Sequence, residues 1–347
     1  MKNESMDNLK IYIDPSYQAF NSDRLFELKD PVLNRDSQLL PFHRFRTHMQ
    51  SKGVSVQTAD FLTNDINSVT SKRHYHSLGI VDNFERIYQN GSAVLKTFVI
   101  MEPPVVLPAL YAALPRLTAI FDSVYLHNTN GNGYSLKGVD TTKLKRLYWP
   151  IPHNDVLFNY WEHSERLKRV VVINGNHNAH GRNRELYSVR IKAMAELSRL
   201  NVVDLYGIGW NRWWSRNSFW LPYWLNLRAL MSIYKGSCVS KFEVLQNYEF
   251  CLCFENMEME GYITEKIFDC VYAGIIPLYL GAPDILKYIP EDVFVDCRNY
   301  SSWTEMWEDV SKFSPEKVNE MRLAGRRFIK SDMAKKFYDS IQNIFEP

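Results

Sequence analysis

In the first half of the chain, short apolar blocks of strand-like composition alternate with polar or amphipathic segments. Residues 41–53 have apolar positions at helical spacing and end at Gly53, as is typical of a helix closed by a glycine cap. The strand-like blocks are bounded by turn residues and lie at 9–14, 54–62, 93–104, 118–128 and 144–152. This alternation predicts a mainly parallel sheet with helices on both faces.

The second half repeats the scheme. Residues 170–173 form a continuous apolar strand, and helical spacing begins near Glu185 after a polar loop. The apolar stripe of that helix consists of Leu186, Val189, Ala193 and Leu197. Further along the chain we expect strands at 202–209, 248–254 and 275–283, with a helix over 264–274.

The repetition predicts an α/β protein built from two Rossmann-like domains. We expect the first domain to cover residues 1–157 and the second to cover 158–347. In sheets of this kind ligands bind at the carboxyl ends of the strands, so functional residues are sought there.

A tryptophan-rich stretch at 210–235 interrupts the second domain. It holds five of the nine tryptophans together with Arg212, Arg216 and Arg228. Tryptophan and arginine suit a sugar platform or a surface that contacts a membrane peripherally, whereas an aromatic insertion packed on its own domain is the alternative.

Composition excludes several functional classes. The formal net charge of +2 gives no electrostatic reason to expect nucleic-acid binding, and any anion site must be local.

With no leader-like start and no long apolar window, we expect a cytoplasmic protein that is soluble or membrane-peripheral. The five cysteines fit reduced core thiols, and Cys251 and Cys253 do not form a CxxC pair, so no metal site is expected.

Residues 254–266, FENMEMEGYITEK, place an unusual lysine at a predicted helix start. Acidic residues are favoured in the first turn, so Glu265 follows the rule and Lys266 breaks it. Two explanations are open: an anion such as phosphate binds at this helix end, or Lys266 is solvated and pairs with Asp269. Arg190 on the preceding helix is a second candidate, because arginine suits a diphosphate.

The chain contains no D-x-D motif, and Glu258-Met-Glu260 imitates one only weakly. A diphosphate leaving group would therefore be neutralised by arginine, lysine and a helix end, with no required cofactor or divalent metal. For Glu258 and Glu260 we expect solvated loop positions.

Residues 248–283, YEFCLCFENMEMEGYITEKIFDCVYAGIIPLYLGAP, resemble the signature of the α-1,3/1,4-fucosyltransferase family, glycosyltransferase family 10. That family has Phe-Glu-Asn, a short loop, Tyr-(Val/Ile)-Thr-Glu-Lys, Ala-Gly, Pro-(Ile/Leu)-Tyr and Gly-(Ala/Ser)-Pro in this order. Upstream, RIKAMAEL and VDLYG are also similar, so the resemblance spans about residues 168–298, apart from the tryptophan-rich stretch.

The resemblance implies a GT-B-type enzyme whose two Rossmann-like domains face each other across a cleft. It implies transfer of L-fucose from GDP-L-fucose to a hydroxyl of an oligosaccharide or lipid-linked glycan, with inversion and an α-1,3-type linkage. By the family pattern Arg190 and Lys266 hold the diphosphate, and Glu265 accepts hydrogen bonds from the ribose. Asn256 and Tyr262 line the donor site.

An inverting transferase needs one carboxylate to take the acceptor's proton. In the family this base is a glutamate that follows a strand of the N-terminal domain, in a Glu-Asn-x-x-Pro-like setting. FVIMEPP offers Glu102 at the predicted carboxyl end of a strand, where it would face the cleft. Pro103 stands where the family has asparagine.

Two rival functions differ from this prediction. The first is a transferase that uses another GDP-sugar, such as GDP-mannose or a deoxyhexose relative. The second is a catalytically silent protein that binds a glycan or nucleotide. A silent binder has no need of a base, so Glu102 together with Arg190, Glu265 and Lys266 favours an enzyme.

Overall fold

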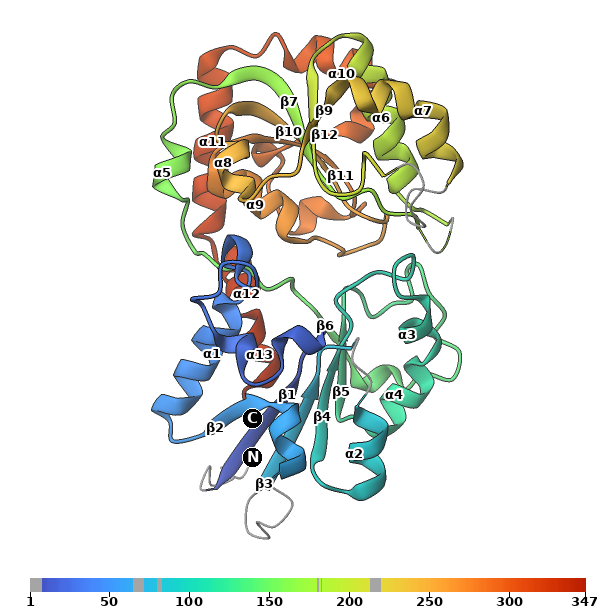
Figure 1. Ribbon diagram of the computed structural model, residues 1–347, viewed down its shortest axis with the longest axis vertical. Coiled ribbons are helices and arrows are strands. Elements are labelled where there is room, and N and C mark those ends of the chain that lie inside the picture. The colour runs from blue at the N-terminus through green and yellow to red at the C-terminus, as the bar shows by residue number, and fades with distance from the viewer. Residues whose placement is uncertain (1–7, 65–71, 80–82, 180, 182, 213–219) are drawn as a thin grey trace. The chain divides into compact units, whose positions relative to one another are not determined.

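The computed structural model describes residues 8–64, 72–79, 83–179, 181, 183–212 and 220–347 (Figure 1). The chain divides into two compact units, one of residues 1–152 with 336–347 and one of residues 153–335. The boundary lies five residues before the predicted one (157 − 152), and residues 336–347 belong to the first unit although we expected them in the second.

A six-stranded parallel sheet forms the centre of the first unit, in the order β2-β1-β3-β4-β5-β6. Its strands are β1 (Leu9–Asp14), β2 (Ser55–Thr58), β3 (Lys72–Ser77), β4 (Val94–Val99), β5 (Ser123–Leu126) and β6 (Leu144–Arg146). The helices are α1 (Leu40–Ser51), α2 (Phe84–Asn90), α3 (Pro108–Ala112), α4 (Leu114–Ile120) and α13 (Ser340–Phe345). This order places a topological switch point between β1 and β3.

Both faces of this sheet are buried. Along β1, Ile11 and Ile13 belong to a core that includes residues of α1 and α13, whereas Tyr12 belongs to a core with residues of α2 and α4. Successive residues of a strand point to opposite faces, so this division places the two sets of helices on opposite sides of the sheet (Figure 1). The prediction that helices cover both faces of the first sheet is therefore confirmed.

The last helix joins the first unit because of its apolar residues. Ile341, Ile344 and Phe345 are buried, and the Phe345 ring lies edge-on to Phe45 of α1 at 5.7 Å. The sequence gives no sign of this placement, since a short apolar helix could cover either sheet.

The second unit holds another parallel sheet, in the order β12-β11-β10-β7-β8-β9. Its strands are β7 (Leu167–Ile173), β8 (Val203–Tyr206), β9 (Tyr234–Gly236), β10 (Tyr248–Phe254), β11 (Ile276–Leu280) and β12 (Val295–Asp296). Numbered along the unit, this is the Rossmann order 3-2-1-4-5-6, with its switch point between β7 and β10.

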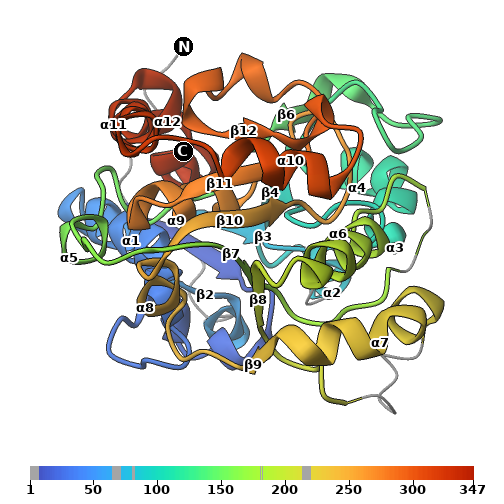
Figure 2. The same cartoon turned by 90° about the horizontal axis from the view of Figure 1, so that it is seen from above.

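Helices cover both faces of the second sheet (Figure 2). They are α5 (Phe158–Trp161), α6 (Tyr187–Arg199), α7 (Leu221–Ile233), α8 (Lys241–Leu245), α9 (Glu265–Ala273), α10 (Trp303–Val310) and α11 (Pro315–Ile329); α12 (Asp332–Tyr338) spans the boundary between the units. Along β10, Phe250 and Leu252 belong to the core shared with α6, α7 and α10. Cys251 and Cys253 alternate with them and are buried free thiols, in line with the predicted core cysteines.

Strand β3 was not predicted, because its sequence KRHYHS lacks an apolar pattern. It nevertheless lies between β1 and β4, with His74 and His76 buried. The Nδ1 atom of His76 is 2.7 Å from the hydroxyl of Thr97 on β4, so a polar pair replaces the usual apolar packing.

The tryptophan-rich stretch is partly core. Residues 213–219 lie outside the described residues, but Trp210 and Tyr223 are buried in the core of the second unit. Most of the described remainder is α7, which also carries Tyr223 and packs beside α6 (Figure 2), and the stretch ends in β9. No helix in the described part of the chain has the length and apolar character needed to span a membrane.

Candidate functional site

The loops after β7 and β10 meet at the switch point of the second sheet. Glu185 and Met257 form an antiparallel bridge, and the N–H of Leu186 donates to the carbonyl of Asn256 at 3.0 Å. The start of α6 is thereby held against the loop that follows β10. Parallel sheets bind ligands at such points, because the neighbouring loops diverge there.

Glu255, the first residue after β10, is the centre of this site. Its side chain has no exposed surface and accepts hydrogen bonds from the N–H and the hydroxyl of Thr264, both at 2.8 Å. The ammonium of Lys266 donates to Oε2 of the same carboxylate at 2.9 Å. Glu255 therefore fixes both the cap residue and the first turn of α9. The sequence had left its role undecided.

Lys266 is held by Glu255, and the alternative prediction that it pairs with Asp269 is wrong. Asp269 instead pairs with Lys241, at 2.5 Å. The ammonium of Lys266 also donates to the Thr264 hydroxyl at 2.9 Å. These two bonds leave one of its three protons without a hydrogen-bond partner among the described residues. Burial lowers the pKa of Lys266, but the charges of Glu255 and Glu265 outweigh it and keep the pKa above its ordinary value.

Arg190, on the first turn of α6, is 3% exposed and lies across the end of β10. Its Nη2 donates to the carbonyls of Phe254 at 2.6 Å and Glu255 at 2.9 Å. Nε is buried and has no hydrogen-bond partner in the described part of the chain. Burial lowers the pKa of Arg190, while the charge of Glu255 opposes that change. A buried guanidinium with a donor to spare can bind an anion.

Glu265 is the first residue of α9, and its Oε2 is likewise buried without a hydrogen-bond partner among the described residues. Burial raises its pKa, but the charges of Lys266 and Lys241 more than offset this and the pKa is lowered. The carboxylate is therefore ionised and can accept hydrogen bonds from hydroxyl groups. Among the described residues, the Thr264 side chain makes no capping hydrogen bond to the backbone of α9, because its hydroxyl donates to Glu255.

Asn256 and Tyr262 complete the predicted group. The amide Nδ2 of Asn256 donates to the Tyr262 hydroxyl at 3.3 Å. Between them, Gly261 has a positive φ of 69°, and its N–H donates to Asp284 at 2.7 Å. The structure brings all five predicted donor residues to one edge of the second sheet; in chain order they are Arg190, Asn256, Tyr262, Glu265 and Lys266.

Gly281 and Thr264 belong to the site but were not singled out from the sequence. A Cβ atom at Gly281 would lie 2.5 Å from Cγ of Glu255 and 2.5 Å from the Tyr279 hydroxyl, so only glycine fits beside the buried carboxylate. The Gly-Ala-Pro motif after β11 was the available signal. Glu258 is half-buried and lies 3.9 Å from Arg184, which is compatible with its expected loop position.

Glu102 belongs to the first unit and lies three residues after β4 (102 − 99). Its backbone carbonyl accepts a hydrogen bond from the Tyr111 hydroxyl at 3.1 Å. Its side chain is half-buried, and burial followed by the negative charge of Glu102 raises the pKa of Tyr17. The predicted position beyond the carboxyl end of a strand is thus observed.

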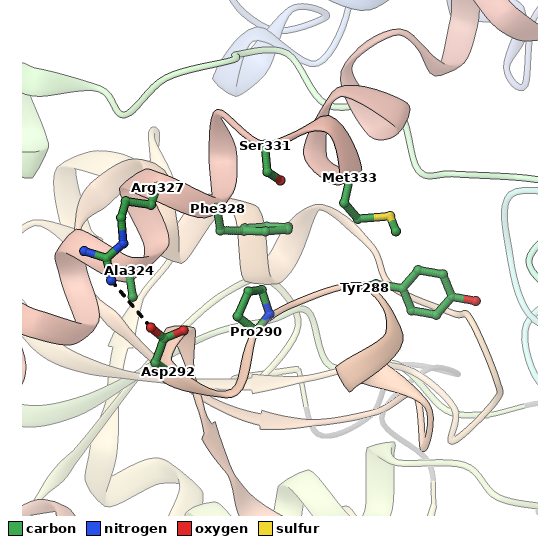
Figure 3. Close-up of a pocket in the computed structure, with 8 residues that line it drawn as sticks. All are labelled: Tyr288, Pro290, Asp292, Ala324, Arg327, Phe328, Ser331 and Met333. Atoms are coloured by element: carbon green, nitrogen blue, oxygen red, sulfur yellow. Dashed lines mark ion pairs between the residues drawn. The ribbon is translucent and has the colours of Figure 1, made fainter.

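Other candidate sites in the second unit are separate from this one. An open cavity of about 420 Å³ has eight lining residues, among them Phe328, Tyr288 and the ion pair of Arg327 with Asp292 (Figure 3). None of the predicted donor residues lines it. No cluster of three His, Cys, Asp or Glu side chains suited to a metal ion occurs in the described part of the chain.

Comparison with known families decides what this domain is. Residues 165–322 match the model of the glycosyltransferase family 10 (fucosyltransferase) C-terminal domain. The matched residues lie within the second unit and make up less than half of the chain. The predicted resemblance is confirmed, and the matched region contains all five predicted donor residues.

Curated relatives match over short stretches. A 66-residue stretch is 39% identical to the α-(1,3)-fucosyltransferase FucT of Helicobacter pylori, and covers 19% of this chain and 14% of that protein. A 74-residue stretch is 30% identical to an α-(1,4)-fucosyltransferase of Arabidopsis thaliana, and covers 21% of this chain and 18% of that protein. A third relative, GDP-fucose protein O-fucosyltransferase 3 of Gallus gallus, is 39% identical over 51 residues, which are 15% of this chain and 11% of that protein.

Solved structures resemble the whole chain in fold. An α1,3-fucosyltransferase has a TM-score of 0.53 at 16% identity, covering 99% of this chain and 92% of that one. An α-glucosyltransferase in complex with UDP has a TM-score of 0.57 at 11% identity, covering 96% and 99%. The likeness confirms the predicted fold class, two Rossmann-like domains of GT-B type.

Proposed function

We propose that this protein transfers L-fucose from GDP-L-fucose to a hydroxyl of an acceptor glycan, with inversion and an α-1,3-type linkage. One observation carries the proposal. Within the region that matches family 10, the buried Arg190 and the partly buried Lys266 converge on Glu255 at the switch point, and both have a donor left for an anion. The names of the α-(1,3)- and GDP-fucose-dependent relatives support the donor and the linkage.

In this proposal the diphosphate and the ribose of the donor bind to charged side chains along one edge of the second sheet. The diphosphate binds to Arg190, Lys266 and the N-terminal turn of α9, where the helix dipole favours an anion. The ionised Glu265 accepts hydrogen bonds from ribose hydroxyls. Asn256 and Tyr262 line the site, and the hydrogen bond between them holds both side chains in place. Neutralising the leaving GDP in this way requires no divalent metal.

Glu102 is the proposed base. Its carboxylate takes the proton of the acceptor hydroxyl while the hydroxyl oxygen attacks the anomeric carbon of fucose. The bond from that carbon to the β-phosphate oxygen breaks, and its electron pair leaves with GDP. Attack opposite the leaving group inverts the anomeric configuration.

The acceptor is proposed as an oligosaccharide or a lipid-linked glycan. The O-fucosyltransferase 3 relatives add protein hydroxyls to the acceptors worth testing. The sequence outside residues 165–322, where the family model does not match, includes the whole first unit. Acceptor choice is therefore left to experiment.

An assay of nucleoside-diphosphate release tests the proposal, since GDP-sugars release GDP and UDP-glucose releases UDP. The purified chain is incubated with GDP-fucose, GDP-mannose and UDP-glucose, each with a panel of oligosaccharide, lipid-linked and peptide acceptors. Acceptor-dependent GDP release from GDP-fucose, with a fucosylated product by mass spectrometry, supports it. Preferred turnover of GDP-mannose would favour the rival GDP-sugar transferase. Tight GDP-fucose binding with no product on any acceptor would favour the silent binder.

A further inference from the structure

The segment from 205 to 242 has an unusual charge pattern. It contains Arg212, Arg216, Arg228, Lys235 and Lys241 but neither aspartate nor glutamate, in a chain whose net charge is only +2. Lys235 and Lys241 pair with Asp204 and Asp269. Arg212 and Arg228 are exposed and form no salt bridge within the described structure.

Helix α7 presents apolar side chains to solvent in the same segment. Leu221 is 68% exposed and Leu225 is 73% exposed. With the exposed Arg228 they follow the spacing i, i+4, i+7, so all three lie on one side of the helix, here called the α7 face. The opposite side is buried, through Tyr223, Leu230 and Ile233. Figures 1 and 2 both show α7 at the outer edge of the second unit, beyond α6.

Leucines beside arginines and half-buried tryptophans are the composition of an interfacial helix. Burial of leucine side chains at the boundary between headgroups and acyl chains is favourable. Arginine side chains next to them can bind the anionic headgroups. Trp220 and Trp224 are partly buried against the core and lie on α7 or next to its start. Their ring Nε1 atoms are buried, so these tryptophans pack α7 on the core, and the leucines and arginine are left to contact the lipid.

Other occupants fit the α7 face less well. Nucleic acid would use the arginines but gain nothing from protruding leucines. A second copy of this chain in a two-fold contact would bring Arg228 near its own symmetry mate, with no acidic residue in the segment to compensate. We therefore propose that the α7 face docks peripherally on an anionic lipid surface. Docking does not depend on the transfer reaction, because α7 contributes none of the donor residues.

Vesicle co-flotation tests this proposal on the full chain. Vesicles of phosphatidylcholine alone are compared with vesicles that also contain phosphatidylglycerol. We expect binding to the anionic vesicles, and at least about a tenfold loss of partitioning in the double variant Leu221→Ser/Leu225→Ser. Arg228→Glu should lower binding to anionic vesicles by several-fold at low salt.

Matched controls are available in the same unit. Leu286 is 59% exposed and lies outside the segment, so Leu286→Ser should bind vesicles like the wild type. Lys317 on α11 is exposed and serves as the charge-reversal control, Lys317→Glu. Near-UV circular dichroism and GDP affinity of each variant check that folding and the donor site are intact.

Three results would overturn the proposal. One is that the wild type fails to float with the anionic vesicles. The second is that the α7 variants lose no more binding than Leu286→Ser and Lys317→Glu. The third is that the leucine double variant dissociates an oligomer of the wild type while vesicle binding is unchanged, which would assign the α7 face to a protein contact.

Discussion

Lys266 donates a 2.9 Å hydrogen bond to Glu255, a carboxylate that has no exposed surface and lies eleven residues earlier in the chain. A lysine in the first turn opposes the helix dipole of α9. The negative charge of Glu255, directly after β10, offsets this unfavourable interaction with the dipole. The ammonium is thereby held at the switch point. The pair also keeps the Thr264 hydroxyl in place.

Removing the Lys266 ammonium should weaken GDP binding. We expect Lys266→Ala and Arg190→Ala each to lose about 1–3 kcal/mol of GDP affinity, because a charge-assisted contact disappears. Isothermal titration calorimetry with GDP measures this. Lys317→Ala is the control, since that side chain is exposed and lies on α11, outside the site. GDP affinity equal to wild type in both variants would refute the anion site.

The Glu255–Lys266 pair should be energetically coupled. Glu255→Gln leaves the ammonium of Lys266, which is 19% exposed, without its main counter-charge. We expect a loss of about 1–3 kcal/mol in the free energy of unfolding. In a double-mutant cycle with Lys266→Met the two losses should not add, leaving a coupling of about 1 kcal/mol or more. Strict additivity in urea denaturation would show that the contact contributes nothing.

Glu102→Gln should slow transfer strongly and spare donor binding. The amide cannot accept the acceptor's proton, so we expect turnover to fall by about 10²–10⁴-fold with GDP affinity unchanged. Glu27→Gln is a control in the same unit, at an exposed carboxylate in a loop. Turnover near that of wild type in Glu102→Gln would mean that another group is the base.

Gly281 should not tolerate a side chain. Its Cβ would overlap Glu255 and Tyr279, so we expect Gly281→Ala to lower the thermal unfolding midpoint and to cost about 1–3 kcal/mol. Gly53→Ala provides a comparison, because a Cβ there would meet nothing within 4 Å and only the positive φ is strained. The steric account fails if Gly281→Ala is no more destabilising than Gly53→Ala.

Stability should fall in mild acid because of His76. Burial, followed by the charges of His74 and Lys96, lowers its pKa from 6.5 to about 3. The unfolded chain therefore binds a proton that the folded chain excludes, and stability is lost as the pH falls below about 6.5 toward 3. Between about pH 7.5 and pH 5 the loss from this residue should be about 2 kcal/mol.

His76→Gln should flatten that dependence, since glutamine carries no titrating group. Denaturant unfolding at the two pH values measures the difference, and His163→Gln in the second unit is the control. An unchanged pH dependence in His76→Gln would rule out this residue as its source.

Local features of the sequence predicted most of the strands and the three helices α1, α6 and α9. The stripe of α6, the apolar block of β10 and the glycine that ends α9 were all read correctly, because periodicity and capping depend on neighbouring residues. The polar strand β3 was missed, since its burial comes from the strands on either side and not from its own composition. The donor motif likewise identified residues that the fold places together.

Only the tertiary structure decided the contacts that join distant segments. Strand order depends on how whole elements pack, so the switch point between β7 and β10 could not be deduced from the spacing of apolar residues. The partner of Lys266 is Glu255 and not Asp269, because the loop after β10 folds back over the start of α9 while Lys241 occupies Asp269. The sequence by itself determined which residue types form the predicted donor site, whereas their hydrogen-bond partners followed from burial, which is a property of the packed chain.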